Sequence, residues 1–186
     1  MAKILSEFEA FPKEKELVGS MLIAYGEIEF ALFSLVDVVL DTQDNAAEIF
    51  FRIRGEGARI EVSDAIIRPF LEKVRLGPKW SNALSPARLS KKIRNQYAHC
   101  HWIIIQDRLH FIDFDQSAEA GKSNKQVSTR PVDQELLEQQ LRYFSYTLDW
   151  LYYLAAEYQL RSGRLESHDL AEPKSVAAPP LYIQCT

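Results

Sequence analysis

Apolar residues recur at alternating spacings of three and four along two long stretches of the chain, which is the period of an amphipathic helix. In the stretch after Pro12 they are Val18, Met21, Tyr25, Ile28, Leu32, Leu35 and Val39. In residues 133–161 they are Leu137, Leu141, Phe144, Leu148, Leu151, Ala155 and Tyr158. The pattern predicts two helices of about seven turns each, and each helix should bury one continuous stripe.

The second of these helices carries another stripe, which is aromatic. Its residues lie roughly 100° around the helix from the first stripe, and they are Tyr143, Tyr146, Trp150 and Tyr153. We expect this aromatic face to be covered by a β-hairpin or to form an interface with a partner.

Turn-forming residues divide the middle of the chain into shorter helices. Residues 46–54 are predicted to form a short helix that the glycines at 55 and 57 end. A third helix is predicted over residues 58–74, with a kink at Pro69 and Gly77-Pro78 as its stop signal. Its inner face is expected to consist of Val62, Ile66, Phe70 and Val74.

A further helix is predicted to start at Ser85-Pro86. A serine hydroxyl at the N-cap, followed by proline at the first helical position, is a good start signal. We expect Leu89, Ile93 and either Tyr97 or Ala98 to face the core. The helix should end within the stretch IRNQYAHC.

The period changes from helical to extended after His101. Residues 102–106 and 109–115 are rich in isoleucine and phenylalanine, and they predict a short β-hairpin joined at Asp107-Arg108. Residues 116–130 lack a period and predict a mobile loop that carries Lys122, Lys125 and Arg130. From Gly163 onward, prolines and little periodicity predict a tail.

Together these elements predict an all-α fold in the main. It is one helical domain over residues 1–163, with a short β-hairpin after the Pro86 helix, followed by a flexible C-terminal tail over residues 164–186. The chain has 186 residues, 47% of them hydrophobic and 26% charged, so it can bury one core of useful size. Two cysteines favour a reducing compartment, and no apolar run suits a signal peptide or membrane span. We therefore expect a cytoplasmic protein.

The net charge of −4 sets a condition on any contact with nucleic acid, because phosphates would repel the chain as a whole. Such a contact has to depend on a local basic patch. The sequence offers one patch of this kind, made of Arg88, Lys91, Lys92 and Arg94. We expect its first three residues to bind the backbone of an RNA.

The richest stretch in chemical groups is KKIRNQYAHCHW, residues 91–102. Metal-independent RNA cleavage needs a group that moves a proton near neutral pH and a cation that stabilises charge on the phosphate. His99 and Arg94 suit these two roles, and Asn95 can either donate a hydrogen bond to a phosphate or cap the local helix. Because Arg94 and His99 are five positions apart, about 140° around a helix, one helix alone cannot close them on a small group.

Two further residues are expected to support this stretch. Tyr97 can stack on a base or pack in the core, and we favour the core. Glu29 lies at the edge of the first helix's buried stripe, where it either reaches water or pairs with a buried arginine. We predict that Glu29 accepts hydrogen bonds from Arg94 and orients it, because an unpaired buried charge is strongly destabilising.

The order R-N-x-x-x-H at Arg94, Asn95 and His99 resembles the signature of the HEPN superfamily, small helical domains whose active members are metal-independent endoribonucleases. The motif similarity covers residues 93–100, and the architecture is similar over most of residues 13–161. The resemblance implies that these three residues are catalytic and that two R-x-x-x-x-H motifs form one cleft in a homodimer. It also implies RNA products with a cyclic phosphate, a role in defence or toxin action, and an antitoxin or other protein partner.

The alternative function is a non-catalytic HEPN-like interaction or regulatory module. HEPN toxins paired with nucleotidyltransferases have a tyrosine where this chain has His101, which argues against that subgroup. Mannitol repressor-like proteins share R-N-x-x-A-H without an established cleavage role, so the motif alone does not imply activity. In this alternative, the motif helix packs a dimer and the aromatic face binds a protein. The acidic net charge favours the module, whereas the basic patch and His99 favour the nuclease.

The motif has two further interpretations. An arginine paired with a carboxylate, beside a satisfied histidine, could simply hold a helix end together, and so short a spacing also occurs by accident. A metal site is not expected, because the adjacent His99, Cys100 and His101 cannot all converge on one ion. No cofactor is expected.

Overall fold

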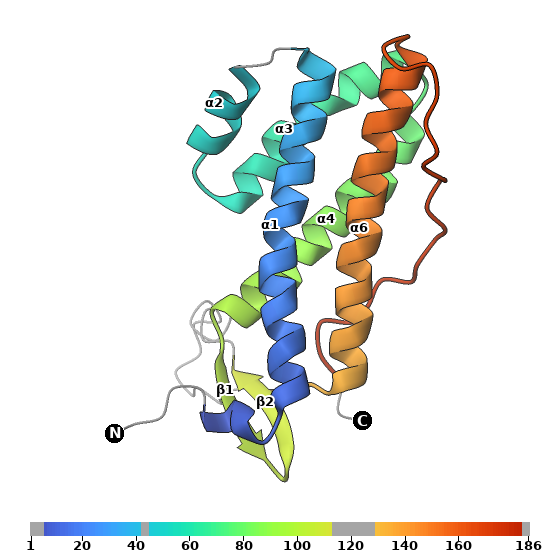
Figure 1. The fold of residues 1–186 in the computed structure, drawn as a ribbon. Helices are drawn as coiled ribbons and strands as arrows, with labels where there is room; N and C mark the ends of the chain where they lie inside the picture. The colour runs from blue at the N-terminus through green and yellow to red at the C-terminus, as the bar shows by residue number, and fades with distance from the viewer. Residues whose placement is uncertain (1–5, 42–44, 113–128, 184–186) are drawn as a thin grey trace.

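The computed structural model describes residues 6–41, 45–112 and 129–183, and this part of the chain is mainly helical, as predicted. Its long helices are α1 (Pro12–Leu40), α3 (Glu56–Lys73), α4 (Gly77–Ala98) and α6 (Gln134–Arg161). Two short helices, η1 (Ser6–Glu9) and α2 (Asn45–Arg52), precede α1 and α3. α1 and α6 run side by side, and α4 crosses behind them (Figure 1). No helix in these ranges has both the length and the apolar character needed to cross a bilayer.

The two longest helices bury the stripes that their spacing predicts. All seven predicted positions of α1 are at most 6% exposed. In α6, four of the predicted positions are buried and three are partly buried against the same core. Pro12 lies in the first turn of α1, where a helix has no acceptor for an N–H, and Asp133 caps α6 by accepting from the Leu136 N–H at 2.9 Å.

The inner face of α3 differs from the prediction by one position. The buried residues are Ile60, Ser63, Ile67 and Leu71. The predicted residues Val62, Ile66, Phe70 and Val74 are only half-buried. The prediction was wrong because Ser63, a polar residue, interrupts the apolar spacing of the face that is buried. Ser63 fits a buried position because its hydroxyl donates to the carbonyl oxygen of Arg59, 2.7 Å away.

The motif helix begins at Gly77 rather than after Ser85, so Gly77-Pro78 starts α4 and does not end α3. Proline suits a first helical turn because an N–H there has no helical acceptor. The break between α3 and α4 lies at Arg75, which has a left-handed φ of 61°. The additional turns bury Trp80, whose indole N–H donates to the Asp64 carboxylate at 2.7 Å.

A three-stranded antiparallel sheet in the order β1-β2-β3 follows α4. β1 (His101–Ile105) and β2 (Arg108–Ile112) form the predicted hairpin. Its turn lies at Gln106-Asp107, one residue earlier than predicted, with φ of 50° and 57° as in a type I′ turn. β3 (Thr129–Pro131) pairs with β2 where we predicted a loop, so that prediction is wrong at residues 129–130. The two lysines predicted in that loop, Lys122 and Lys125, lie outside the described residues.

The chain beyond α6 has no helix or strand but follows a defined path. From the C-terminal end of α6 it runs back along this helix (Figure 1). Near the N-terminal end of α6, Gln140 donates to the Pro180 carbonyl at 2.8 Å, and Gln96 of α4 donates to the Leu181 carbonyl at 2.9 Å. We call residues 164–183, which the sequence led us to expect as a flexible tail, the C-terminal strap.

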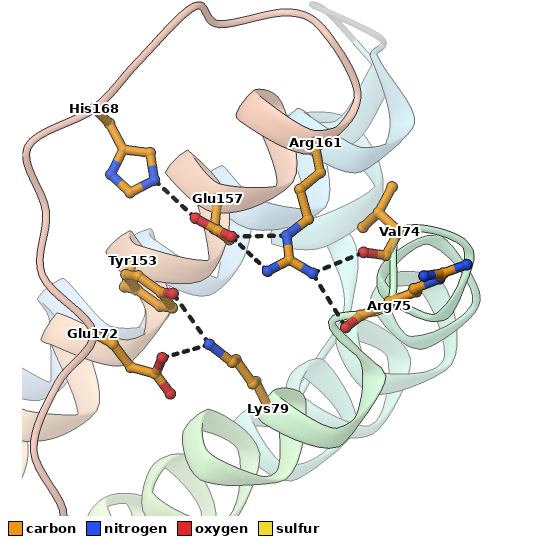
Figure 2. Close-up of polar contacts among 8 residues, drawn as sticks. All are labelled: Val74, Arg75, Lys79, Tyr153, Glu157, Arg161, His168 and Glu172. Carbon is orange, nitrogen blue, oxygen red and sulfur yellow. Dashed lines mark hydrogen bonds and ion pairs between the residues drawn. The ribbon is translucent and has the colours of Figure 1, made fainter.

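Side chains hold the other half of the C-terminal strap (Figure 2). The His168 ring lies 3.0 Å from the carboxylate of Glu157, which also pairs with Arg161 at 2.7 Å. Lys79 of α4 forms an ion pair with Glu172 of the strap. The strap is thus connected by polar contacts to both α4 and α6.

The aromatic face of α6 is covered by the chain itself. Tyr143, Trp150 and Tyr153 are at most 6% exposed, and Tyr146 is half-buried. The Tyr153 ring packs edge-on against His168 of the C-terminal strap, with ring centroids 6.1 Å apart. The strap therefore contributes cover where the sequence suggested a hairpin or a partner.

Candidate functional site

The motif residues lie at the C-terminal end of α4, where the chain passes into β1. Ala98 is the last helical residue, and the His99 N–H donates to the Asn95 carbonyl at 3.2 Å. Arg94 Nη1 donates to Asn95 Oδ1 at 3.0 Å. The structure therefore joins Arg94 and Asn95 directly and places His99 one turn beyond Asn95.

The His99 side chain is exposed to solvent. Its ring makes no hydrogen bond or ion pair with any residue that the structure describes. An exposed imidazole in this position can accept and donate protons without breaking a contact of the fold.

Arg94 pairs with Glu56, the first residue of α3, at 2.7 Å. Glu29 of α1 pairs instead with Arg59, also of α3, at 2.8 Å. The predicted pair between Glu29 and Arg94 is therefore wrong. The start of α3 supplies both a carboxylate and a guanidinium at this point. Arg94 therefore pairs with Glu56, and Glu29 pairs with Arg59.

Tyr25 of α1 lies within this charged cluster and was missed as a functional candidate. The Arg94 guanidinium stands over its ring, 5.7 Å from the centroid. The side chain is 2% exposed, and its hydroxyl has no hydrogen-bond partner among the described residues. Burial raises the pKa of Tyr25, and the carboxylates of Glu29 and Glu56 raise it further. The sequence does contain a signal that could have identified Tyr25: its hydroxyl lies within the apolar stripe of α1, four residues before Glu29 and therefore near the same face of the helix.

The basic patch predicted from the sequence is partly neutralised. Arg88 makes two hydrogen bonds to the Glu61 carboxylate, at 2.7 and 3.1 Å, and lies 3.6 Å from Asp64. Lys91 and Lys92 have no ion pair within the described part of the chain. Because neither lysine is paired there, these two are the cations of the patch that remain free for an anion. Lys92 is exposed and Lys91 is partly buried.

Tyr97 packs in the core, as predicted. Its hydroxyl donates to the side-chain oxygen of Gln140 at 2.7 Å, and its ring stacks on Trp102 with centroids 5.5 Å apart. Burial raises the pKa of Tyr97, so the hydroxyl stays protonated and keeps donating. Tyr97 therefore fixes the end of α4 against α6 and the sheet and is not available to a ligand.

The described residues contain no group of three or more histidine, cysteine, aspartate or glutamate side chains arranged to hold a metal ion. Comparisons with protein-family models, curated proteins and solved structures give no match. A function for Arg94, Asn95 and His99 is therefore inferred from their positions in this structure alone.

Proposed function

We propose that this protein is a metal-independent endoribonuclease that acts as a homodimer, in which two clusters of Arg94, Asn95 and His99 face one cleft. The observation that carries the proposal is the exposed His99 ring, which has no partner within the described chain and lies one turn beyond Asn95, the residue to which Arg94 donates a hydrogen bond. Its neighbours Gln96 and Tyr97 are both bound to other parts of the fold. His99 is therefore available for chemistry, whereas its neighbours are not.

The reaction would be an internal transfer at phosphorus. One His99 removes the proton of the ribose 2′-hydroxyl, the 2′-oxygen bonds to phosphorus, and the bond from phosphorus to the 5′-oxygen breaks. The second His99 of the dimer, in its protonated form, donates a proton to that leaving oxygen. The products are a 2′,3′-cyclic phosphate and a 5′-hydroxyl, so no water is consumed in this step.

Arg94 would stabilise the negative charge that grows on the phosphate. Its contacts with Glu56 and Asn95 both use Nη1. Nη2 and Nε make no hydrogen bond within the described chain, so the guanidinium can bind a phosphate while it keeps its pair with Glu56.

The test is RNA cleavage by the purified protein in EDTA, alongside its mass in solution. Light scattering should give about twice the 21.4 kDa of one chain. His99→Ala and Arg94→Ala should each lower the cleavage rate at least about a hundredfold. His101→Ala is the matched control, because it removes an exposed imidazole two residues away. A monomer, or equal loss in the control variant, would contradict the proposal.

The second candidate is a non-catalytic interaction or regulatory module that binds a protein partner. One observation favours it: Arg88 and Arg94 are both held by carboxylates of α3, as expected of arginines with a structural role. A folded dimer that leaves varied single-stranded RNAs intact would support this candidate over the nuclease.

A further inference from the structure

Lys91 occupies an unusual place at the start of α3. Its Nζ lies 2.9 Å from the position that a Cβ on Gly57 would occupy. The N-cap of α3 is Gly55, with φ of 90° and no capping side chain. The start of a helix carries partial positive charge, so a lysine there is disfavoured unless an anion accompanies it.

The carboxylates near this helix start are already paired. Glu56 binds Arg94 at 2.7 Å, and Glu29 binds Arg59 at 2.8 Å. Two carboxylates thus balance two guanidiniums, and Lys91 has no ion-pair partner in the described part of the chain. The cluster carries one positive charge in excess, in addition to the unpaired N–H groups of the first helical turn.

Tyr25 of α1 lies beside the same cluster, with the Arg94 guanidinium 5.7 Å from the centroid of its ring. The charged groups that act on its hydroxyl are Glu29, Glu56, Arg94 and Arg59. It is 2% exposed and lacks a hydrogen-bond partner among the described residues. Because burial keeps it protonated, this hydroxyl needs an acceptor.

We infer that the start of α3 binds a phosphate group of the RNA backbone, held by Lys91, the Tyr25 hydroxyl and the first-turn N–H groups of residues 56–58. All of these groups are donors, and a phosphodiester supplies several acceptor oxygens and the missing negative charge. Arg94 pairs with Glu56 at this site and donates to Asn95, whose carbonyl accepts from the His99 N–H, so the bound phosphate would lie near the reacting one. The inference rests on the proposed function only for RNA as the source of the phosphate.

The first experiment uses inorganic phosphate, so it is independent of cleavage. The backbone amide NMR signals of residues 56–58 should shift and saturate on phosphate titration, compared with sodium chloride at equal ionic strength. Lys91→Gln and Tyr25→Phe should each weaken binding about tenfold. Lys73→Gln, at the other end of α3, and Tyr152→Phe, at an exposed tyrosine, are the matched controls. Absence of saturable shifts, or equal losses in the controls, overturns the inference.

The second experiment identifies the source of the phosphate. A short single-stranded RNA added to the His99→Ala protein should shift the same amides and compete with inorganic phosphate. If phosphate binds and RNA does not compete, the inference about the RNA backbone is wrong. Cleavage that depends on His99 but ignores Lys91→Gln and Tyr25→Phe would leave the nuclease standing and refute this site. A protein that binds RNA phosphate at this site but never cleaves RNA would support the site and contradict the nuclease.

Discussion

Tyr25 and Tyr97 are two buried phenols whose hydroxyl groups have different surroundings. Tyr97 donates to the side chain of Gln140, whereas the Tyr25 hydroxyl has no acceptor in the described chain. Their burial follows from helical spacing, and Tyr97 was assigned to the core from the sequence. Helical spacing identifies the buried face of a helix, but it does not reveal which groups meet across helices. The mistaken pair of Glu29 and Arg94 has the same cause, since both real partners come from α3.

We predict that Tyr97→Phe and Tyr25→Phe differ in their effect on stability. Tyr97→Phe should lower the free energy of unfolding by about 1–3 kcal/mol, because it leaves the buried Gln140 oxygen without its donor. Tyr25→Phe should leave it unchanged or raise it, since the group removed is a buried donor without a hydrogen-bond partner in the described chain. Urea unfolding of both variants measures the difference. Equal losses would mean that the Tyr25 hydroxyl has a partner in the fold.

Among the elements, sequence periodicity predicted α1 and α6 well and the boundaries of α4 poorly. Gly77-Pro78 marks a break between helices, but the dipeptide alone does not say whether it ends one helix or starts the next. Residues 129–131 join the sheet through long-range pairing with β2, and no local pattern reports such pairing. The C-terminal strap was expected as a tail for a related reason. Its contacts are carbonyl groups and separate side chains, which have no period.

The contact of the C-terminal strap with α6 should depend on pH. Burial by itself would raise the pKa of Glu157, but hydrogen bonds from His168 and Arg161 outweigh it and hold the pKa below its usual value of 4.5. A carboxylate with a depressed pKa in the folded state stabilises the protein above its unfolded pKa. This contribution is lost as the pH falls from about 4.5 through the folded pKa.

Glu157→Gln tests this linkage. The variant should be less stable than the wild type near pH 7, and the difference between them should shrink as the pH falls below about 4.5. Thermal unfolding at several pH values measures it. Glu166→Gln, at an exposed position of the strap, is the control and should follow the wild type throughout. A difference that stays constant with pH would show that the Glu157 charge is not the cause.

For the whole molecule, the net charge of −4 and the pairing of Arg88 leave few cations to attract RNA. The basic residues can be located in the sequence, but whether they are free to bind an anion depends on α3, which supplies Glu56, Glu61 and Asp64. The arrangement of two chains in a dimer likewise cannot be predicted from the sequence. The motif spacing shows only that Arg94 and His99 of one chain cannot close on a small group by themselves. The dimer therefore remains part of the proposal.

Salt dependence of RNA binding tests this view of the charges. With the His99→Ala protein, Lys92→Gln should reduce the slope of log affinity against log salt by about 0.7, the value for one phosphate contact on a single strand. Removing the Arg88–Glu61 pair together, as Arg88→Gln with Glu61→Gln, should change the slope much less, because that pair is already neutral. Fluorescence anisotropy at several salt concentrations measures both slopes. A larger change for the double variant would mean that Arg88 leaves Glu61 to bind RNA.

The most direct test of the central claim is analysis of the RNA ends produced in EDTA. A 5′-labelled single-stranded RNA incubated with the wild-type dimer should yield fragments ending in a 2′,3′-cyclic phosphate, and an equal amount of folded His99→Ala dimer should yield almost none. Intact RNA with the wild type, or the same fragments at the same rate with His99→Ala, would contradict the assignment of His99 as the group that moves the proton.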